Sequence, residues 1–222
     1  MIAIVGAMEE EISQYKKHCE NFTKICGRTF YFGKIEDKKI IVVASGVGKV
    51  NAAITATILH TEFNIKTILN IGTAGGLSEK YKIGDVLVSS EFCYYDADLT
   101  GFGKQMGQIL NEPFIFPASK DLLNKVEKPT GLFVTGDQFI ARQDQVEHIK
   151  KYFPEAIIVE MEGAAMAHAC YQLKIQFVGI RAITDILGKE SISDFQNNLI
   201  SASKNCYDYV IEYIKKLNYI YE

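Results

Sequence analysis

The length, composition and charge of the chain exclude several classes of protein. Its 222 residues include 24 Lys+Arg and 27 Asp+Glu, so the formal net charge of −3 gives no electrostatic case for a nucleic-acid partner. The five cysteines are odd in number and include no C-x-x-C pair, which favours buried thiols in a reducing cytoplasm over a disulfide framework or a thiolate metal site. The first apolar run is too short for a signal peptide or a membrane span. We therefore expect a cytoplasmic protein with no membrane partner.

Short apolar runs alternate along the chain with amphipathic segments of helical length. This alternation predicts one α/β domain over residues 1–222, with a mixed, mainly parallel central sheet flanked by helices on both faces. A long irregular stretch from Tyr94 to Pro117 is of the kind that is usually functional or lies at an interface. The predicted strands are 2–6, 30–35, 39–46, 66–72, 84–90, 131–137, 156–160 and 177–185, and the predicted helices are Met8–Cys19, Val50–Phe63, Gln143–Phe153, Glu162–Leu173 and a last one over 195–217.

Three consecutive glutamates follow the first predicted strand. Acids in the first turn of a helix interact favourably with the helix dipole, which explains acids here but not any one of them in particular. Met8 and Ile12 belong to an apolar stripe that is expected to face the interior. On a helical wheel Glu11 lies about 60° from Met8, whereas Glu9 and Glu10 lie about 100° and 160° away. Glu11 is therefore the glutamate expected to point inward.

Acidic residues gather after the carboxyl ends of the predicted strands, where open α/β sheets bind their ligands. They come from three separate segments, MEEE, VEMEG and Asp185, with an aromatic side chain nearby at Phe139. Alternation along the last strand places Arg181 on the same face as Asp185. Each acid alone is explained by a helix start, a cap or a turn. Their convergence favours a ligand site, because desolvated acids are costly unless they are used.

Two glycine-rich segments, SGVGKVN and GTAGG, lie at the same edge. Val43 and Val50 stand where the phosphate loop G-x-x-x-x-G-K-[ST] needs Gly and Ser/Thr, and neither segment contains G-x-G-x-x-G. The segments therefore predict tight strand-to-helix turns, with close approach of the backbone to a ligand as the alternative. The four histidines show no H-E-x-x-H pattern and are interpreted as ordinary helix residues. No metal site is expected.

Seven motifs occur together in one order and spacing: GAMEEE, SGVGKVNAA, IGTAGGL, YYDAD with TGFG, TGDQFI, VEMEGAAMAH and RAITD. In these motifs the chain closely resembles the bacterial 5′-methylthioadenosine/S-adenosylhomocysteine nucleosidases of the nucleoside phosphorylase superfamily. The resemblance implies a hydrolase that uses water, and no cofactor, to cleave the bond between adenine and a 5′-substituted ribose. It also implies a role in methionine salvage and in recycling the by-products of S-adenosylmethionine.

The same resemblance assigns roles to individual residues. It makes Glu11 the base that activates water and Asp185 the acid that protonates N7 of adenine. Glu162 corresponds to the carboxylate that holds the 2′ and 3′ hydroxyls of the ribose. The remaining positions implied to bind substrate are Val47, Thr73, Gly75, Phe139 under the purine, Ile140 at its amino edge, Glu160, Met161 beneath the sugar, Arg181, Thr184 and Phe195, with Leu99 and Phe102 contributed by the neighbouring subunit of a homodimer.

Three positions depart from the family pattern: Lys104 stands where an aromatic residue is expected, Thr73 replaces a serine, and Gly163 replaces a threonine. These departures leave open whether the preferred 5′-substituent is methylthio, homocysteinyl, deoxy or of the futalosine type. The alternatives are a purine nucleoside phosphorylase, an aminodeoxyfutalosine nucleosidase, and a non-catalytic nucleoside-binding module. A phosphorylase needs arginines to hold phosphate, and the first strand-end segment MIAIVGAMEEE and the segment IGTAGGL contain none.

Overall fold

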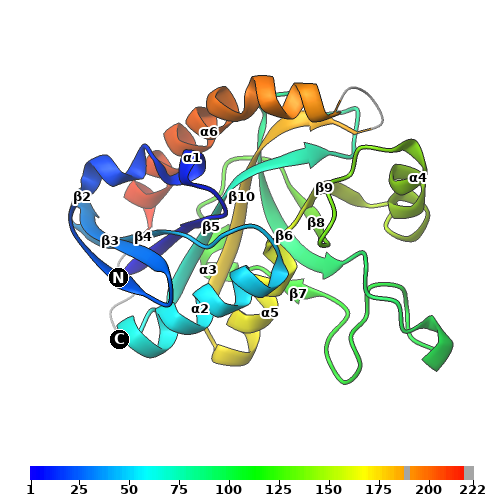
Figure 1. The fold of residues 1–222 in the computed structure, drawn as a ribbon, viewed down its shortest axis with the longest axis horizontal. Helices are drawn as coiled ribbons and strands as arrows, with labels where there is room; N and C mark the ends of the chain where they lie inside the picture. The colour runs from blue at the N-terminus through cyan, green and yellow to red at the C-terminus, as the bar shows by residue number, and fades with distance from the viewer. Residues whose placement is uncertain (188–190, 218–222) are drawn as a thin grey trace.

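The computed structural model describes residues 1–187 and 191–217, and its strands form one mixed sheet between helices. Figure 1 shows the arrangement of these elements. The strands are β1 (Ile2–Gly6), β2 (Cys19–Ile25), β3 (Arg28–Ile35), β4 (Lys38–Ala44), β5 (Thr67–Gly76), β6 (Val86–Tyr94), β7 (Phe116–Pro117), β8 (Thr130–Thr135), β9 (Ala156–Glu160) and β10 (Gln176–Ile186). The α-helices are α1 (Glu9–Ile12), α2 (Lys49–Phe63), α3 (Lys120–Leu123), α4 (Gln143–Tyr152), α5 (Gly163–Leu173) and α6 (Ser191–Lys216).

The strands follow the order β10-β6-β8-β9-β5-β1-β4-β3-β2. Strand β10 also pairs with β5, so β5, β10, β6, β8 and β9 close into a ring. Neighbours β4, β1, β5 and β10 run parallel, as do β6, β8 and β9, whereas β10–β6, β5–β9, β3–β4 and β2–β3 are antiparallel. The parallel strands β4, β1, β5 and β10 therefore direct their carboxyl ends the same way, and the antiparallel pairings make the whole sheet mixed. This confirms the expected α/β fold with a mixed central sheet.

Helices cover both faces of the sheet, with α6 and α1 on one face and α2 and α5 on the other (Figure 1). Strand β1 shows why its sequence is apolar throughout. Ala3 and Val5 belong to the core that contains buried residues of α2 and α5, whereas Ile4 packs in the core that contains the buried side of α6. Because alternate side chains enter opposite cores, a strand covered on both faces has no polar positions in its middle.

The first predicted helix is wrong beyond its first turn. Instead of a helix over Met8–Cys19, α1 ends at Ile12, a 3₁₀ turn spans Tyr15–His18, and β2 begins at Cys19. The sequence pattern also missed β2 itself. In this strand only Cys19, Thr23 and Ile25 are partly buried, because β2 lies at the sheet edge and pairs with β3 alone among the described strands. A half-covered edge strand lacks the continuous apolar run that identified the central strands.

The two glycine-rich segments form different structures. Residues 45–48 make the expected turn into α2, with Gly46 and Gly48 at φ values of 86° and 96°. The expected turn at GTAGG is absent, because these residues continue β5 as far as Gly76. Gly75 pairs there with Asp185 of β10 and with Val159 of β9. The glycines of GTAGG thus form the end of a strand that is closely packed between β10 and β9, and they do not form a turn.

The predicted irregular stretch corresponds to the segment between β6 and β7. It holds a short 3₁₀ turn at Thr100–Phe102 and projects from the body of the protein (Figure 1). The cysteine prediction is correct for Cys93, Cys170 and Cys206, which are buried thiols, whereas Cys26 is exposed in the turn before β3. Among residues 1–187 and 191–217, no helix is both long and apolar enough to cross a membrane.

Candidate active site

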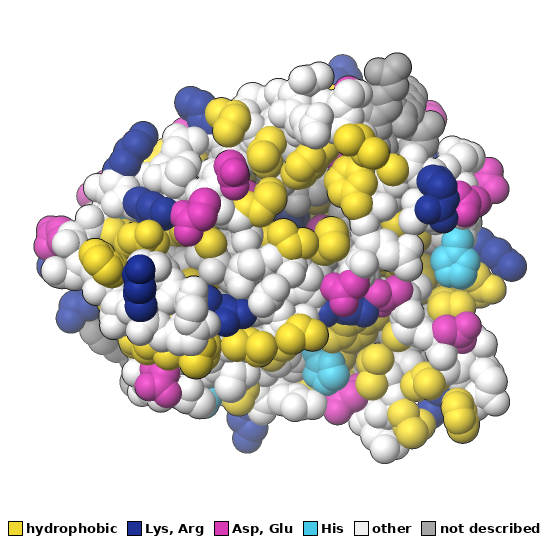
Figure 2. Space-filling view, viewed as in Figure 1, with side chains coloured by type: hydrophobic (Ala, Val, Ile, Leu, Met, Phe, Trp, Pro, Cys, Tyr) yellow, Lys and Arg dark blue, Asp and Glu magenta, His cyan; other side chains and the backbone are white. Residues whose placement is uncertain are grey.

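A cavity of about 280 Å³ opens at the carboxyl ends of β1, β5, β9 and β10. On the face shown in Figure 2, apolar side chains gather below α6, the helix whose Phe195 borders the cavity. The cavity is lined by Ala7, Met8, Glu11, Val47, Thr73, Ala74, Gly75, Gln138, Phe139, Ile140, Val159, Glu160, Met161, Glu162, Thr184, Asp185, Leu187 and Phe195. Its walls are mainly apolar with a few converging acids, which is typical of a small-molecule site.

The structure brings most of the predicted site residues together. Twelve of the fifteen line this cavity, whereas Arg181, Leu99 and Phe102 do not. Arg181 lies behind the cavity wall, 2% exposed, and the other two belong to the projecting segment between β6 and β7. Sequence reasoning missed six lining residues, most of which adjoin predicted ones in the motifs: Ala7, Met8, Ala74, Gln138, Val159 and Leu187.

Glu11 points inward as expected and is 5% exposed. Its Oε2 accepts hydrogen bonds from the backbone N–H groups of Ala7 and Met8, at 2.8 and 3.1 Å. Its Oε1 accepts from the backbone N–H and the hydroxyl of Thr73, at 2.8 and 3.0 Å. A Cβ on Gly72 would lie 2.5 Å from Oε1, so glycine is needed at that position for the two strands to hold the carboxylate. Four donors, two from the residues that follow β1 and two from Thr73 of β5, therefore orient this side chain within the cavity wall.

Asp185 reaches the cavity because β10 is irregular near its end. The register with β5 shifts between Ile183 and Asp185, which leaves Thr184 as an extra residue and interrupts the simple alternation expected for this strand. The Thr184 hydroxyl donates a hydrogen bond to Asp185 Oδ1 at 2.8 Å. Asn198 of α6 donates to the Thr184 carbonyl at 3.1 Å and ties the helix to this strand end. Asp185 is 2% exposed, so its carboxyl group is shielded from bulk water.

Glu162 lies at the start of α5, where its Oε1 accepts a hydrogen bond from the Gly48 backbone N–H at 2.8 Å. The adjacent Glu160 accepts from the backbone N–H groups of Glu162 and Gly163, at 3.1 and 2.7 Å. Burial and the charge of Glu160 raise the pKa of Glu162 to about 8, against the opposing charge of Arg181. Glu160 and Glu162, the two acids of the segment VEMEG, thus have different hydrogen-bond partners and different environments.

We expect the raised pKa of Glu162 to make the protein less stable as the pH rises. In the folded state this carboxyl group keeps its proton to about pH 8, whereas its ordinary pKa is 4.5. Its contribution to stability is therefore present below pH 4.5 and is lost as the pH rises through about 8. The melting temperature should fall less between pH 5 and pH 9 in Glu162→Gln than in the wild type, while the exposed Glu10→Gln behaves like the wild type. Parallel curves for all three proteins would contradict this.

Phe139 and Phe195 form an aromatic pair beside the cavity, with ring centroids 5.6 Å apart and planes at 73°. Phe139 follows β8 and is 42% exposed, and Phe195 comes from the first turns of α6. Both rings line the cavity, as does the adjacent Ile140. An exposed aromatic face at a cavity is suited to stacking against a planar ring such as a purine.

All three arginines are bound away from the cavity as the described residues define it. Arg28 donates to Thr55 and Asn51 on α2, at 2.9 Å each. Arg142 pairs with Asp144 on the surface, and Arg181 is buried beside Glu160. Among the described residues, no three His, Cys, Asp or Glu side chains are placed to hold a metal ion.

This fold and its carboxylate-lined cavity are those of the phosphorylase superfamily, whose family model matches residues 1–215 of the chain. Within that class, the 5′-methylthioadenosine/S-adenosylhomocysteine nucleosidase of Staphylococcus carnosus (strain TM300) is 41% identical over 228 residues, which cover 98% of this chain and 100% of the relative. The chain belongs to the family of 5′-methylthioadenosine/S-adenosylhomocysteine nucleosidases. The resemblance seen in the sequence motifs is therefore confirmed over the length of the relative.

Solved structures agree with this assignment. The nucleosidase of Colwellia psychrerythraea 34H in complex with adenine superposes with a TM-score of 0.94 at 38% identity, over 97% of this chain and 95% of that one. The futalosine hydrolase of Helicobacter pylori strain 26695 superposes with a TM-score of 0.92 at 28% identity, over 97% of each chain. The fold alone therefore accommodates more than one nucleoside hydrolase.

Proposed function

We propose that the chain hydrolyses the N-glycosidic bond of 5′-methylthioadenosine, S-adenosylhomocysteine and related 5′-substituted adenosines. The products are adenine and the free 5-substituted ribose. The observation that carries the proposal is the arrangement of Glu11, Asp185 and Glu162, three buried carboxyl groups from separate strand ends around one cavity. The S. carnosus relative bears the name of this activity, and the Colwellia relative holds adenine. A non-catalytic binding module would have no use for both Glu11 and Asp185.

In the proposed mechanism Asp185 acts on the adenine side of the N-glycosidic bond, and Glu11 acts on the sugar side. Asp185 protonates N7 of the purine, so that adenine leaves as a neutral molecule, with the Thr184 hydroxyl orienting the acid. Glu11 accepts a proton from the water that attacks the sugar. Each transfer contributes about 10²–10⁴-fold to the rate. The combination of an acid and a base around an oxocarbenium-like sugar follows the logic of inverting glycosidases, with nitrogen as the leaving atom.

The remaining lining residues bind the substrate in this proposal. Phe139 stacks on the purine, the backbone of Ile140 meets its amino edge, and Glu162 accepts hydrogen bonds from the ribose hydroxyls. Met161 packs beneath the sugar, and Phe195 covers the 5′-substituent. Val47, Thr73, Gly75, Glu160 and Thr184 complete the cavity wall, and Arg181 acts from behind it. The activity would serve methionine salvage in the cytoplasm.

Phosphate decides between hydrolysis and phosphorolysis, which both occur on this fold. A phosphate dianion beside the ribose calls for arginines, and none of the three lines the cavity as described. We expect adenine release at the same rate with and without phosphate, and a free sugar as product. Chromatography of the products from reactions in phosphate-free buffer and in added phosphate measures this. Cleavage that stops without phosphate and yields a sugar 1-phosphate would replace the hydrolase assignment.

A second candidate substrate, 6-amino-6-deoxyfutalosine, is supported by the structural likeness to the H. pylori futalosine hydrolase. The methylthioadenosine reading is favoured by the greater identity of the S. carnosus and Colwellia relatives. Values of kcat/KM for methylthioadenosine, S-adenosylhomocysteine, 5′-deoxyadenosine and the futalosine, measured side by side, rank these substrates. A futalosine value well above the other three would make it the main substrate.

A homodimer belongs to the same proposal. Large apolar side chains stand exposed on the packed helix pair α2 and α5, at Val50, Ile54 and Tyr171, and on the projecting segment, at Phe102. Phe102 is 78% exposed, so its ring is available for contact with a second copy of the chain. In the proposed dimer Leu99 and Phe102 reach the partner's cavity and contact the 5′-substituent.

Phe102→Ala should therefore raise KM for methylthioadenosine more than KM for adenosine, because it removes an apolar contact with the 5′-methylthio group. The exposed Phe22, on the far strand β2, provides the control, since Phe22→Ala should change neither KM. Initial rates with both substrates and sedimentation of the wild type provide the measurements. An active monomer, or equal changes in both KM values, would remove this role from the segment.

A further inference from the structure

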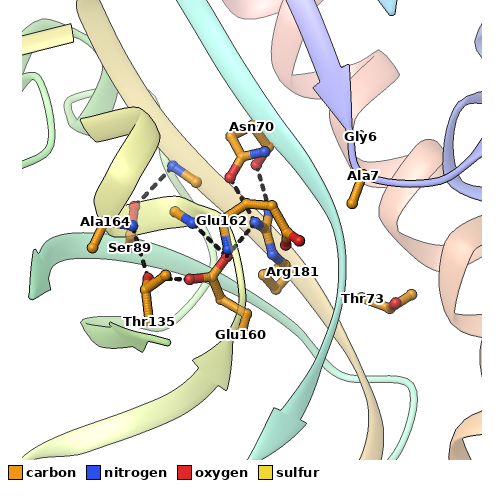
Figure 3. Close-up of polar contacts among 12 residues, drawn as sticks. Gly6, Ala7, Asn70, Thr73, Ser89, Thr135, Glu160, Glu162, Ala164 and Arg181 are labelled. Carbon is orange, nitrogen blue, oxygen red and sulfur yellow. Dashed lines mark hydrogen bonds and ion pairs between the residues drawn. The ribbon is translucent and has the colours of Figure 1, made fainter. Parts of the chain in front are cut away.

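A chain of buried polar side chains links five strands of the sheet at the cavity wall. It runs from Thr135 on β8 through Glu160 on β9, Arg181 on β10 and Asn70 on β5 to the Val5 carbonyl on β1. Figure 3 shows Arg181 between Asn70 and Glu160. The four residues are between 0% and 6% exposed. Buried polar networks of this kind rigidify what they contact when every member is satisfied.

One end of this chain fixes the turn that presents Glu162. Glu160 Oε2 accepts from the backbone N–H groups of Glu162 and Gly163, and the Thr135 hydroxyl accepts from the Ala164 N–H at 2.7 Å while donating to Glu160 Oε1. Three successive N–H groups at the start of α5 are thereby held by side chains, although this helix has no side-chain cap of its own at Glu162. The position of the Glu162 backbone depends on the orientation of Glu160.

Arg181 orients the Glu160 carboxylate and compensates its negative charge. Its Nη2 donates to Glu160 Oε2 at 2.7 Å, and both side chains of this ion pair are 2% exposed. A buried carboxylate without such a partner would be strongly destabilised. The same guanidinium donates from Nη1 to the Asn70 carbonyl at 2.8 Å and from Nη2 to Asn70 Oδ1 at 2.6 Å.

Asn70 anchors the other end. Its Nδ2 donates to the Val5 carbonyl at 3.0 Å, on the strand whose end carries the backbone donors that hold Glu11. Asn70 is 1% exposed and is not among the described residues that line the cavity. An asparagine in the middle of a buried strand, between Leu69 and Ile71, is costly unless its amide is used. Both ends of this amide are used, one for Arg181 and one for β1.

We infer that Asn70 is a positioning residue for recognition of the ribose, acting through Arg181 and Glu160 on Glu162. This inference rests on the proposed function, because it takes the ribose hydroxyls as the ligands of Glu162. Asn70 fixes the guanidinium, the guanidinium fixes the Glu160 carboxylate, and that carboxylate fixes the turn from which Glu162 reaches the sugar. Loss of Asn70 lets this turn shift without removing any group that touches the substrate.

The test compares methylthioadenosine with its 2′,3′-dideoxy analogue, which lacks both of the hydroxyls that Glu162 is proposed to hold. Asn70→Leu should lower kcat/KM for methylthioadenosine about tenfold or more, because small misplacements of binding groups are costly. It should lower kcat/KM for the dideoxy analogue by no more than about twofold, since effects that act through the contacts of Glu162 with the ribose hydroxyls vanish once those contacts are absent. Glu160→Gln, which keeps the size of the side chain, should give the same selective loss if Asn70→Leu fails to fold.

Ser89→Ala is the matched control. The Ser89 hydroxyl is equally buried and accepts from the Gly179 N–H at 2.8 Å, so its loss also weakens a buried contact to β10 but leaves the chain from Thr135 to Asn70 intact. This variant should lower both kcat/KM values equally or not at all. Equal losses on both substrates in Asn70→Leu and Glu160→Gln would reduce Asn70 to a structural role and overturn the inference. A wild type that releases adenine from neither substrate would instead refute the proposed function.

Discussion

Asp185→Asn is expected to lower kcat by at least about 10²-fold, because an amide cannot deliver a proton to N7 of the purine. The change keeps the size of the side chain, and the Thr184 hydroxyl can still donate to its Oδ1. Substrate should therefore bind nearly as well as to the wild type, and the loss should fall on kcat more than on KM. Steady-state kinetics of adenine release measure both constants.

A second substrate separates acid catalysis by Asp185 from a general disturbance of the site. The O-glycoside 4-nitrophenyl 5-methylthioriboside has a leaving group that departs as a phenolate and needs no proton. The variant should lose far less activity on this substrate than on methylthioadenosine. Asp144→Asn, at an exposed aspartate that pairs with Arg142, serves as the control and should keep wild-type rates on both. Near-normal kcat for methylthioadenosine in Asp185→Asn would remove Asp185 from the mechanism.

Glu11→Gln should lower kcat to a similar degree, by about 10²-fold or more, because the amide cannot accept the proton of the attacking water. Its structural consequence is sharper than that of Asp185→Asn. Both Glu11 oxygens accept two hydrogen bonds each, so the NH₂ group of glutamine must face either the N–H groups of Ala7 and Met8 or the donors of Thr73. We therefore expect a modest fall in melting temperature as well.

The binding of adenine distinguishes the chemical effect of Glu11→Gln from this structural one. Glu11 holds water on the sugar side, so the dissociation constant of adenine should stay close to that of the wild type. Glu10→Gln, one residue earlier on the exposed side of α1, provides the control and should leave kcat unchanged. If Glu11→Gln turns over at the wild-type rate, another group activates the water.

Local patterns identified the elements that are covered on both faces. The runs around β1, β4 and β5 are apolar because alternate side chains enter two different cores, and this pattern survives in the sequence whatever the neighbouring strands are. The edge strand β2 and the early end of α1 left no such pattern. There the chain follows pairing with β3, which is a contact between segments and not a property of either segment alone.

Within the candidate site, the sequence by itself determined the inward direction of Glu11, the grouping of acids at the strand ends and, through the motifs, the family. It did not determine the different surroundings of those acids. Asp185 owes its place to a register shift against β5, and Glu162 owes its raised pKa to burial and to Glu160. The chain from Thr135 to Asn70 was also out of reach, because its members are far apart in sequence and meet only when five strands are in register. Hydrogen bonds and desolvation act over a few ångströms in space, so only the tertiary structure decides which side chains share them.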